Sequence, residues 1–216
     1  MNKKIILFDW DDTLFSKVEY KKNLRSNLAR ICEVSEEEIF NFEEKYFDNL
    51  IKSDDFQIDD FVKSFSQKFG KEIKLEDFDS DNLKIYSRAL FSDTIPTLNI
   101  LKNDFRLGIY SQGFVDLQKI KIKSSGIKNY FDEQLIYINR DKLNPEFINK
   151  LPDGAIIVED KLEVVIKLKA FGRFDIVWIN RKTDEKEEGV TTIKNLTELV
   201  HFVKSRNILT ETQMTA

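Results

Sequence analysis

The chain has 216 residues, of which 41% are hydrophobic and 33% are charged, and this length suits one packed domain or a core domain with a smaller insert. Its net charge is −4, with basic and acidic residues interspersed, which argues against a nucleic-acid partner because nucleic-acid binding needs a basic face. No stretch approaches the roughly eighteen apolar residues that cross a bilayer, so we expect no membrane partner. The single cysteine, Cys32, allows no internal disulfide, and we expect a cytoplasmic protein.

A short apolar run over residues 4–8 opens the chain and ends at Asp9, as expected for a strand buried on both faces of a parallel sheet. After a long helical block, four similar runs alternate with helical patterns. The later strands are expected at residues 106–110, 134–138, 155–158 and 175–179, and the helices at about 114–125, 145–151, 161–171 and 196–206. This alternation predicts an α/β fold, with a Rossmann-like parallel sheet core covered by helices on both sides.

The block between the first two strands contains no convincing strand and several amphipathic helical patterns. Ser35 followed by Glu38 forms a capping box, which marks the start of one of these helices. We interpret the block as an all-helical cap domain inserted into the core. The expected domains are the cap, residues 16–92, and the core, residues 1–15 and 93–216.

Acidic and polar side chains follow the predicted strands at the points where the strands end. They are Asp9, Asp11, Asp12 and Thr13 after the first strand, Ser111 and Gln112 after the second, Lys142 in the loop after the third, and Glu159 and Asp160 after the fourth. In open α/β sheets the ligand binds beyond the carboxyl ends of the strands, so we expect these side chains to cluster there.

The residue types at the strand ends favour Mg²⁺ over zinc as the cofactor. Carboxylates packed together repel one another unless a cation lies between them, and oxygen ligands suit a hard ion such as Mg²⁺. The only histidine, His201, lies far in sequence from every one of these segments. A zinc site built from clustered Cys and His is therefore not expected.

Four segments of the chain resemble the four motifs of the haloacid dehalogenase-like superfamily. These motifs are an apolar run followed by Asp-x-Asp-x-Thr, a Ser or Thr that closes a strand, a Lys, and an acidic pair that ends a strand. The matching residues are, in motif order, Asp9, Asp11 and Thr13; Ser111; Lys142; and Glu159 with Asp160. Order and spacing agree, and the resemblance covers the whole chain.

The resemblance implies a role for each of these residues. Asp9 would be the nucleophile that attacks phosphorus, and Asp11 would protonate the leaving alcohol and then activate the hydrolytic water. Mg²⁺ would be held by Asp9, the main-chain carbonyl of Asp11 and Asp160, with Glu159 assisting directly or through water. The residues implied at the substrate phosphate are Asp12, where this superfamily often has Gly, and Thr13, Ser111, Gln112 and Lys142.

Several of these residues have alternatives in the sequence. Ser111 is also suited simply to end a strand or to cap a helix. Arg140 and Lys128 compete with Lys142 as the lysine-motif cation. Asp160 is also suited to be the N-cap of the following helix. Glu163, three positions later, is as well suited to a solvated helix face as to the second carboxylate that the family often has there.

Asp11 argues against dehalogenation, because the dehalogenase branch of the superfamily lacks this second aspartate. The resemblance therefore implies a Mg²⁺-dependent phosphatase, a hydrolase of the EC 3.1.3 type, whose partner is a small-molecule phosphate ester. The helical insert occupies the position of the cap in proteins similar to phosphoglycolate phosphatase and β-phosphoglucomutase. The first alternative is a phosphomutase with the same aspartyl-phosphate intermediate, and the second is a non-catalytic binding or regulatory protein on the same fold.

Overall fold

The computed structural model describes residues 3–49, 58–74 and 84–214. The chain divides into two compact units: a core unit, residues 1–16 and 90–216, and a helical unit, residues 17–89. Two segments of the expected cap, residues 50–57 and 75–83, lie outside the described residues. Within the described part of the chain, no helix has both the length and the apolar character that a membrane span requires.

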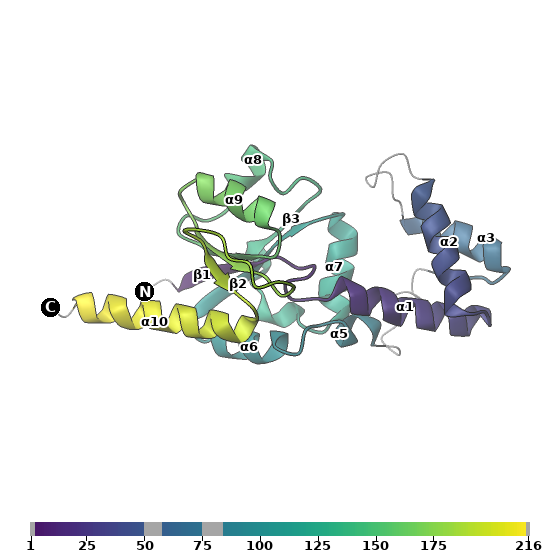
Figure 1. The fold of residues 1–216 in the computed structure, drawn as a ribbon, viewed down its shortest axis with the longest axis horizontal. Helices are drawn as coiled ribbons and strands as arrows, with labels where there is room; N and C mark the ends of the chain where they lie inside the picture. The colour runs from purple at the N-terminus through teal and green to yellow at the C-terminus, as the bar shows by residue number, and fades with distance from the viewer. Residues whose placement is uncertain (1–2, 50–57, 75–83, 215–216) are drawn as a thin grey trace. The chain divides into compact units, whose positions relative to one another are not determined.

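The core unit is built on a six-stranded parallel sheet with the strand order β3-β2-β1-β4-β5-β6 (Figure 1). The strands are β1 (Lys4–Phe8), β2 (Phe105–Gln112), β3 (Ile136–Asn139), β4 (Ile156–Glu159), β5 (Asp175–Ile179) and β6 (Thr191–Ile193). This is the strand order of a Rossmann-like sheet, so the predicted fold class is confirmed. Because β1 pairs with both β2 and β4, its carboxyl end is flanked by theirs.

Helices cover both faces of the sheet. They are α6 (Thr94–Leu101), α7 (Val115–Ser124), α8 (Pro145–Ile148), α9 (Leu162–Ala170) and α10 (Leu196–Met214), with two short 3₁₀ helices, η3 (Lys128–Tyr130) and η4 (Glu133–Leu135), before β3. In Figure 1, α8 and α9 lie on one face of the sheet, and α6 and α10 lie on the other. Leu7 and Ile157 of the sheet pack with Phe147 of α8 and Val164 of α9 in one buried cluster.

Several elements differ from those expected from the sequence, among them α8, which ends at Ile148 rather than near residue 151, and three of the differences have a local cause. β3 begins at Ile136, because the preceding residues form η4, whose N-cap Asp132 accepts a hydrogen bond from the main chain of Gln134. β6 has only three residues and begins with two threonines, so it lacks the apolar run that marks a buried strand. α10 continues to Met214 rather than ending near residue 206, since no Gly or Pro interrupts it there.

The helical unit packs its helices around a cluster of buried aliphatic and aromatic side chains. Its helices are α1 (Lys17–Cys32), α2 (Glu36–Asp48), α3 (Ile58–Phe69) and α5 (Ile85–Arg88). Leu28 and Ile39 from the first two helices and Phe65 from α3 are fully buried in this cluster. The predicted capping box at the start of α2 is confirmed, because the side chains and main-chain N–H groups of Ser35 and Glu38 bond reciprocally.

Gly108 is required where β2 packs against η4. A Cβ at this position would lie 2.6 Å from the Cβ of Leu135 and 2.7 Å from Cδ2 of Leu7, both of them buried. We therefore expect Gly108→Ala to lower the free energy of unfolding by about 1–3 kcal/mol, the usual cost of overpacking a core. Urea denaturation followed by circular dichroism measures this change. A shift within about 0.5 kcal/mol, the range of ordinary surface substitutions, would contradict the prediction.

Candidate active site

The carboxyl ends of β1 and its two neighbours carry three of the predicted site residues. Asp9 directly follows β1, and its main-chain N–H donates a 2.8 Å hydrogen bond to the carbonyl of Val158 in β4. Ser111 lies near the end of β2, and Glu159 is the last residue of β4. All three side chains are buried. These three side chains lie close together because the sheet aligns the ends of its buried apolar strands, where the polar residues stand.

Lys142 is a buried cation between two carboxylates. Its Nζ lies 2.7 Å from Oδ1 of Asp9 and 2.6 Å from Oε2 of Glu159. The Lys142 side chain is only 1% exposed, and those of Asp9 and Glu159 are 6% and 0% exposed. The hydroxyl of Tyr110 donates a hydrogen bond to the Lys142 carbonyl. This bond fixes the main chain at Lys142.

The loop that carries Lys142 is shaped by its own sequence. The Asp141 side chain accepts a hydrogen bond from the main-chain N–H of Leu143. Asn144 caps α8 by accepting from the N–H of Glu146, and Pro145 occupies the first helical turn, where its missing N–H costs no hydrogen bond. The turn and the capped helix thus fix the main chain on the C-terminal side of Lys142.

The three charges at this site act strongly on one another. Burial raises the pKa of Asp9 above its ordinary value, against the opposing effect of Lys142. Burial and the nearby charge of Asp9 raise the pKa of Glu159 to about 8. Burial alone would lower the pKa of Lys142, but the charges of Asp9 and Glu159 outweigh it and raise that pKa. Lys142 therefore stays a cation at neutral pH and supplies fixed positive charge next to Asp9.

Asp9, Glu159 and Asp160 form the acidic cluster that fits a metal ion. Each offers a carboxylate oxygen, and these atoms all lie within 4.8 Å of one another. The donors are all oxygen, which suits Mg²⁺. Glu159 already accepts hydrogen bonds on both oxygens, from Lys142 and from the main-chain N–H of Lys161. The hydrogen bonds described for Asp9 use only Oδ1, so its Oδ2 is the better placed atom for a ligand.

Two hydroxyls of the predicted phosphate site are buried without a protein hydrogen-bond partner. Among the residues that the structure describes, neither Ser111 Oγ nor Thr13 Oγ1 has one, although Ser111 is 1% exposed and Thr13 0%. A buried polar group without a partner is costly, so a ligand oxygen that binds there would remove that cost. Gln112 is different: its side chain is exposed and donates to the carbonyl of Arg140.

Asp12 has a left-handed main-chain conformation, with φ of 66°. Asp and Asn adopt this conformation more readily than most residues, and Gly does so without strain. The Asp at this position is therefore compatible with the left-handed main chain, which a Gly would also adopt. The Asp12 side chain lies 3.7 Å from Nζ of Lys182.

Asp11 is paired with two residues that were not predicted from the sequence. Lys121 Nζ lies 2.9 Å and 3.1 Å from its two carboxylate oxygens, and Gln118 Nε2 lies 3.0 Å from Oδ2. Both residues come from α7, which starts just beyond the end of β2. A signal was present in the sequence, because a helix that follows such a strand end directs the polar residues of its first turns toward the same edge of the sheet.

A second unpredicted group contacts the loop after β1. Arg181 donates to the carbonyl of Thr13 at 3.0 Å and pairs with Asp93 at 2.9 Å. Asp93 in turn accepts from the main-chain N–H of Leu196 at 2.8 Å, and the Arg181 guanidinium lies 3.9 Å from the centroid of the Phe91 ring. These contacts connect the loop after β1 with the starts of α6 and α10. No sequence pattern marked Arg181, because its partners lie far apart along the chain.

The alternatives for the lysine motif lie elsewhere in the core unit. Arg140 is exposed, with its guanidinium 4.6 Å from the centroid of the Phe114 ring. Lys128 is half exposed and pairs with Glu133 at 2.7 Å. Of the three candidates, Lys142 is the cation described in contact with Asp9.

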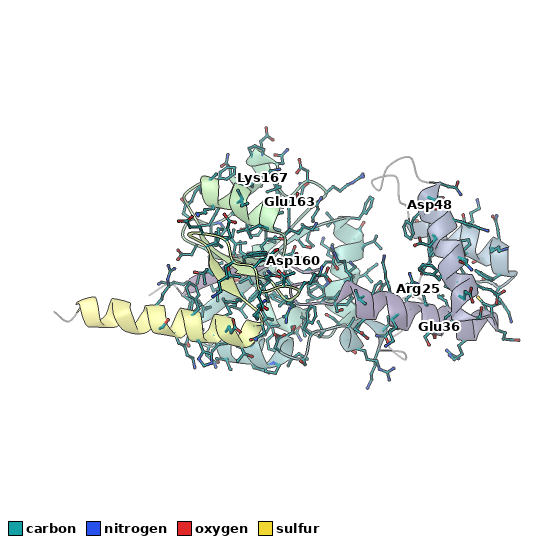
Figure 2. The ribbon with its side chains drawn as sticks, in the orientation of Figure 1. Arg25, Glu36, Asp48, Asp160, Glu163 and Lys167 are labelled. Carbon is teal, nitrogen blue, oxygen red and sulfur yellow. The ribbon has the colours of Figure 1, made fainter. Side chains whose placement is uncertain are left out.

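The carboxylates after β4 separate into two groups. Asp160 belongs to the acidic cluster, and the N-cap position of α9 is occupied by Lys161, which makes no side-chain capping hydrogen bond. Glu163 is exposed on the first turn of α9, with Lys167 one turn further along the same helix (Figure 2). Glu163 is not among the carboxylates of the described cluster. His201 is exposed on α10.

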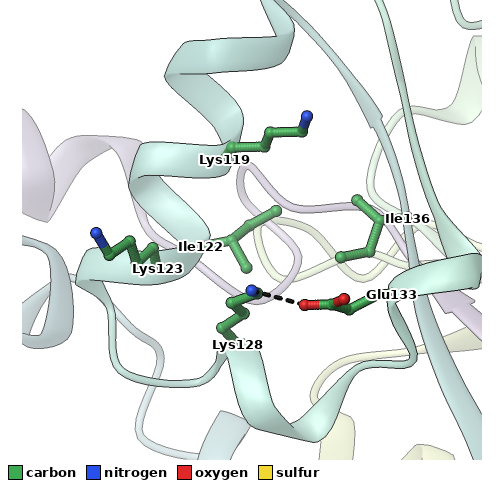
Figure 3. Close-up of a pocket in the computed structure, with 6 residues that line it drawn as sticks. All are labelled: Lys119, Ile122, Lys123, Lys128, Glu133 and Ile136. Carbon is green, nitrogen blue, oxygen red and sulfur yellow. Dashed lines mark ion pairs between the residues drawn. The ribbon is translucent and has the colours of Figure 1, made fainter.

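A separate cavity of about 460 Å³ lies between α7 and the segment before β3 (Figure 3). The residues that line it are Lys119, Ile122, Lys123, Lys128, Glu133 and Ile136. They include none of the acidic cluster or its lysine. The basic side chains of this cavity therefore belong to a different surface from the carboxylates at the strand ends.

Solved structures similar to this chain share its fold. A phosphatase of the haloacid dehalogenase (HAD) family from Thermococcus onnurineus has 25% sequence identity and a TM-score of 0.57, covering 93% of this chain and 97% of its own. YfnB from Bacillus subtilis, described as a HAD-hydrolase bound to magnesium, has 16% identity and a TM-score of 0.60, covering 94% and 99%. L-2-haloacid dehalogenase from Xanthobacter autotrophicus has 16% identity and a TM-score of 0.58, covering 95% and 99%.

The similar structures also include a protein described as a β-phosphoglucomutase. No protein-family model and no curated protein matches the chain. The parallel sheet is an α/β fold with an acidic cluster at the carboxyl edge of its strands. With the four motifs at that edge, the chain has the fold of these structures, which are described as phosphatases and hydrolases of the haloacid dehalogenase-like superfamily.

Proposed function

We propose that this protein is a Mg²⁺-dependent phosphatase that hydrolyses a small phosphomonoester through an aspartyl-phosphate on Asp9. The observation that carries the proposal is the environment of Asp9. It is a buried carboxylate at a strand end, with the Lys142 ammonium 2.7 Å from one oxygen and the carboxylates of Glu159 and Asp160 beside it. A nucleophile, a fixed cation and a set of oxygen ligands for a metal are the parts that phosphoryl transfer requires.

The reaction has two halves that use the same two aspartates. In the first, an oxygen of Asp9 attacks phosphorus in line, the bond from phosphorus to the leaving oxygen breaks, and Asp11 gives that oxygen a proton. In the second, water attacks the phosphorus of the acyl phosphate while Asp11 accepts the proton of the water. Phosphate is then released and the Asp9 carboxylate is restored.

Several groups would hold the phosphoryl oxygens during both halves. The hydroxyl of Ser111, which has no hydrogen-bond partner in the described part of the chain, and the ammonium of Lys142 are both buried. They supply a hydrogen bond and a positive charge. Mg²⁺ bound by Asp9, Asp160 and the Asp11 carbonyl would add further positive charge at the same oxygens. Glu159 holds Lys142 in place and does not itself contact the phosphoryl group, since both of its oxygens already accept hydrogen bonds from the protein.

Asp11 favours phosphate-ester chemistry over dehalogenation. A halide leaves without a proton, whereas an alkoxide leaving group needs one, and the chain holds Asp11 in place with two hydrogen-bond donors. A phosphomutase would use the same intermediate and pass the phosphoryl group to a second hydroxyl instead of to water. A non-catalytic role would not require this complete set of acidic residues.

The decisive assay measures phosphate release from a panel of small esters, including sugar phosphates, phosphoglycolate, nucleoside monophosphates and p-nitrophenyl phosphate. We expect release with Mg²⁺ and none with EDTA, and restoration when Mg²⁺ is added back in excess. Equal release with EDTA would contradict the proposal. Rapid formation of an isomeric sugar phosphate without free phosphate would favour the mutase.

A further inference from the structure

We infer that Lys121 and Gln118 of α7 are positioning residues for Asp11, an inference that rests on the proposed function. Three hydrogen bonds reach the Asp11 carboxylate from these two side chains, at 2.9, 3.0 and 3.1 Å. They bind both carboxylate oxygens, and a carboxylate held at both oxygens has little freedom to rotate. The general acid of the reaction is thereby held in one orientation relative to Asp9.

The orientation of Gln118 follows from its neighbours. Its side-chain nitrogen lies 3.0 Å from the Asp11 carboxylate and 2.9 Å from the carbonyl of Gln112. The carbonyl accepts only, and so does the Asp11 carboxylate in its ionised form, so the NH₂ end of the amide faces them. Gln118 is 3% exposed, and it therefore forms a fixed bridge between the end of β2 and the loop after β1.

Gly113 makes room for this bridge. A Cβ at Gly113 would lie 2.9 Å from the side-chain nitrogen of Gln118, and the residue has φ of +148°. A side chain at this position would therefore push Gln118 away from Asp11. In this short segment, Ser111 is thus a candidate phosphate ligand, and Gly113 leaves space for the side-chain amide of Gln118.

Lys121 adds charge to the same arrangement. Lys121 and Gln118 are three positions apart, so they lie on one side of α7. Asp11 and Lys121 each have side chains that are 20% exposed, so their ion pair is protected from much of the solvent. The two aspartates of the motif consequently have separate cations: Lys142 at Asp9 and Lys121 at Asp11.

How much the positioning of Asp11 contributes to the rate depends on the leaving group of the ester. An alkoxide needs the proton of Asp11 as it leaves, so phosphoryl transfer from an alkyl ester depends on where that carboxyl lies. p-Nitrophenolate is stable without a proton, so its departure depends little on Asp11. A residue that positions Asp11 affects the first ester far more than the second, whereas a residue that only stabilises the fold affects both equally.

The test compares Lys121→Met with wild type in single-turnover release of the leaving group, which isolates the first half of the reaction. The substrates are p-nitrophenyl phosphate and the alkyl phosphate that wild type hydrolyses fastest. We expect the rate for the alkyl ester to fall by about tenfold to a hundredfold and the rate for the nitrophenyl ester by less than about threefold. Lys121→Arg, which keeps a charged donor, should recover part of the alkyl rate.

Lys119→Met is the matched control, because Lys119 is an exposed lysine of the same helix that lines the separate cavity of Figure 3. Its two rates should equal those of wild type. Gln118→Met asks the same question through the second residue, and it replaces Lys121→Met if that variant does not fold. Binding of beryllofluoride with Mg²⁺ should be retained in every variant, which shows that the surroundings of Asp9 are intact.

The outcomes separate the two hypotheses. If wild type hydrolyses neither ester, the proposed function fails and the positioning role fails with it. If wild type is active but the variants lower both rates equally, or lower neither, the proposed function stands and the positioning role is wrong. Only a selective loss with the alkyl ester supports the positioning role.

Discussion

Asp9→Asn should abolish phosphate release, with a loss of at least about four orders of magnitude, as is usual when a covalent nucleophile is removed. The amide has no carboxylate oxygen with which to form an acyl phosphate. The fold should survive, because the Asn side chain keeps an oxygen that can accept a hydrogen bond from Lys142, which remains paired with Glu159. Burial raises the pKa of Asp9, so ionisation there opposes folding, and thermal stability should be equal to or higher than that of wild type.

The control is Asp104→Asn, which makes the same chemical change at an exposed residue just before β2. Asp104 lies at the opposite edge of the sheet from the strand ends that carry the site. Its activity should match that of wild type. Beryllofluoride binding gives a second measurement: we expect it in wild type with Mg²⁺ and not in Asp9→Asn. Retained turnover in Asp9→Asn, or beryllofluoride binding without Asp9, would rule out an aspartyl-phosphate at this residue.

The sequence predicts the sheet and the strand-end residues well, for a physical reason. Strands buried on both faces appear as continuous apolar runs, and the residue after each run lies at the carboxyl edge of the sheet. Asp9, Ser111 and Glu159 can therefore be located from local patterns alone. β6 could not be, because an edge strand of three residues with two threonines has no such pattern.

The remaining parts of the site depend on contacts between distant segments. Lys121 and Asp11 are 110 positions apart, and Arg181 and Thr13 are 168 apart. Such pairs form only when the helices and loops pack. The position of α7 directly after β2 places its polar residues near the site, but no local pattern identifies Asp11 as the partner of Lys121 or Thr13 as the partner of Arg181. Gln112 illustrates the opposite case: its place beside Ser111 suggested a phosphate ligand, yet its side chain is turned to the Arg140 carbonyl. Alternation along a strand sends neighbouring residues to opposite faces.

Lys142→Met should have the second large effect, and it should affect both stability and activity. The substitution leaves Asp9 and Glu159 as buried carboxylates without the cation that lies between them. Removing one partner from a buried ion pair costs about 3–5 kcal/mol, because the remaining charge is uncompensated. Activity should fall by about a thousandfold or more, since the transferring phosphoryl group loses a fixed positive charge. Lys150→Met, at an exposed lysine after α8, should change neither quantity.

The stability loss in Lys142→Met should depend on pH, with a sign fixed by Glu159. Burial and the charge of Asp9 raise the pKa of Glu159 to about 8, and Lys142 opposes that rise. A carboxyl with a higher pKa in the folded than in the unfolded chain loses folding stability as the pH rises toward the folded value. Without Lys142 the pKa of Glu159 in the folded chain rises further. Glu159 then stays protonated at pH 6, and the cost of ionising it in the folded state appears mainly at higher pH. In urea denaturation with EDTA, the loss in free energy of unfolding relative to wild type should therefore be larger at pH 9 than at pH 6. A loss that is equal at both pH values, or larger at pH 6, would show that Lys142 does not neutralise this pair.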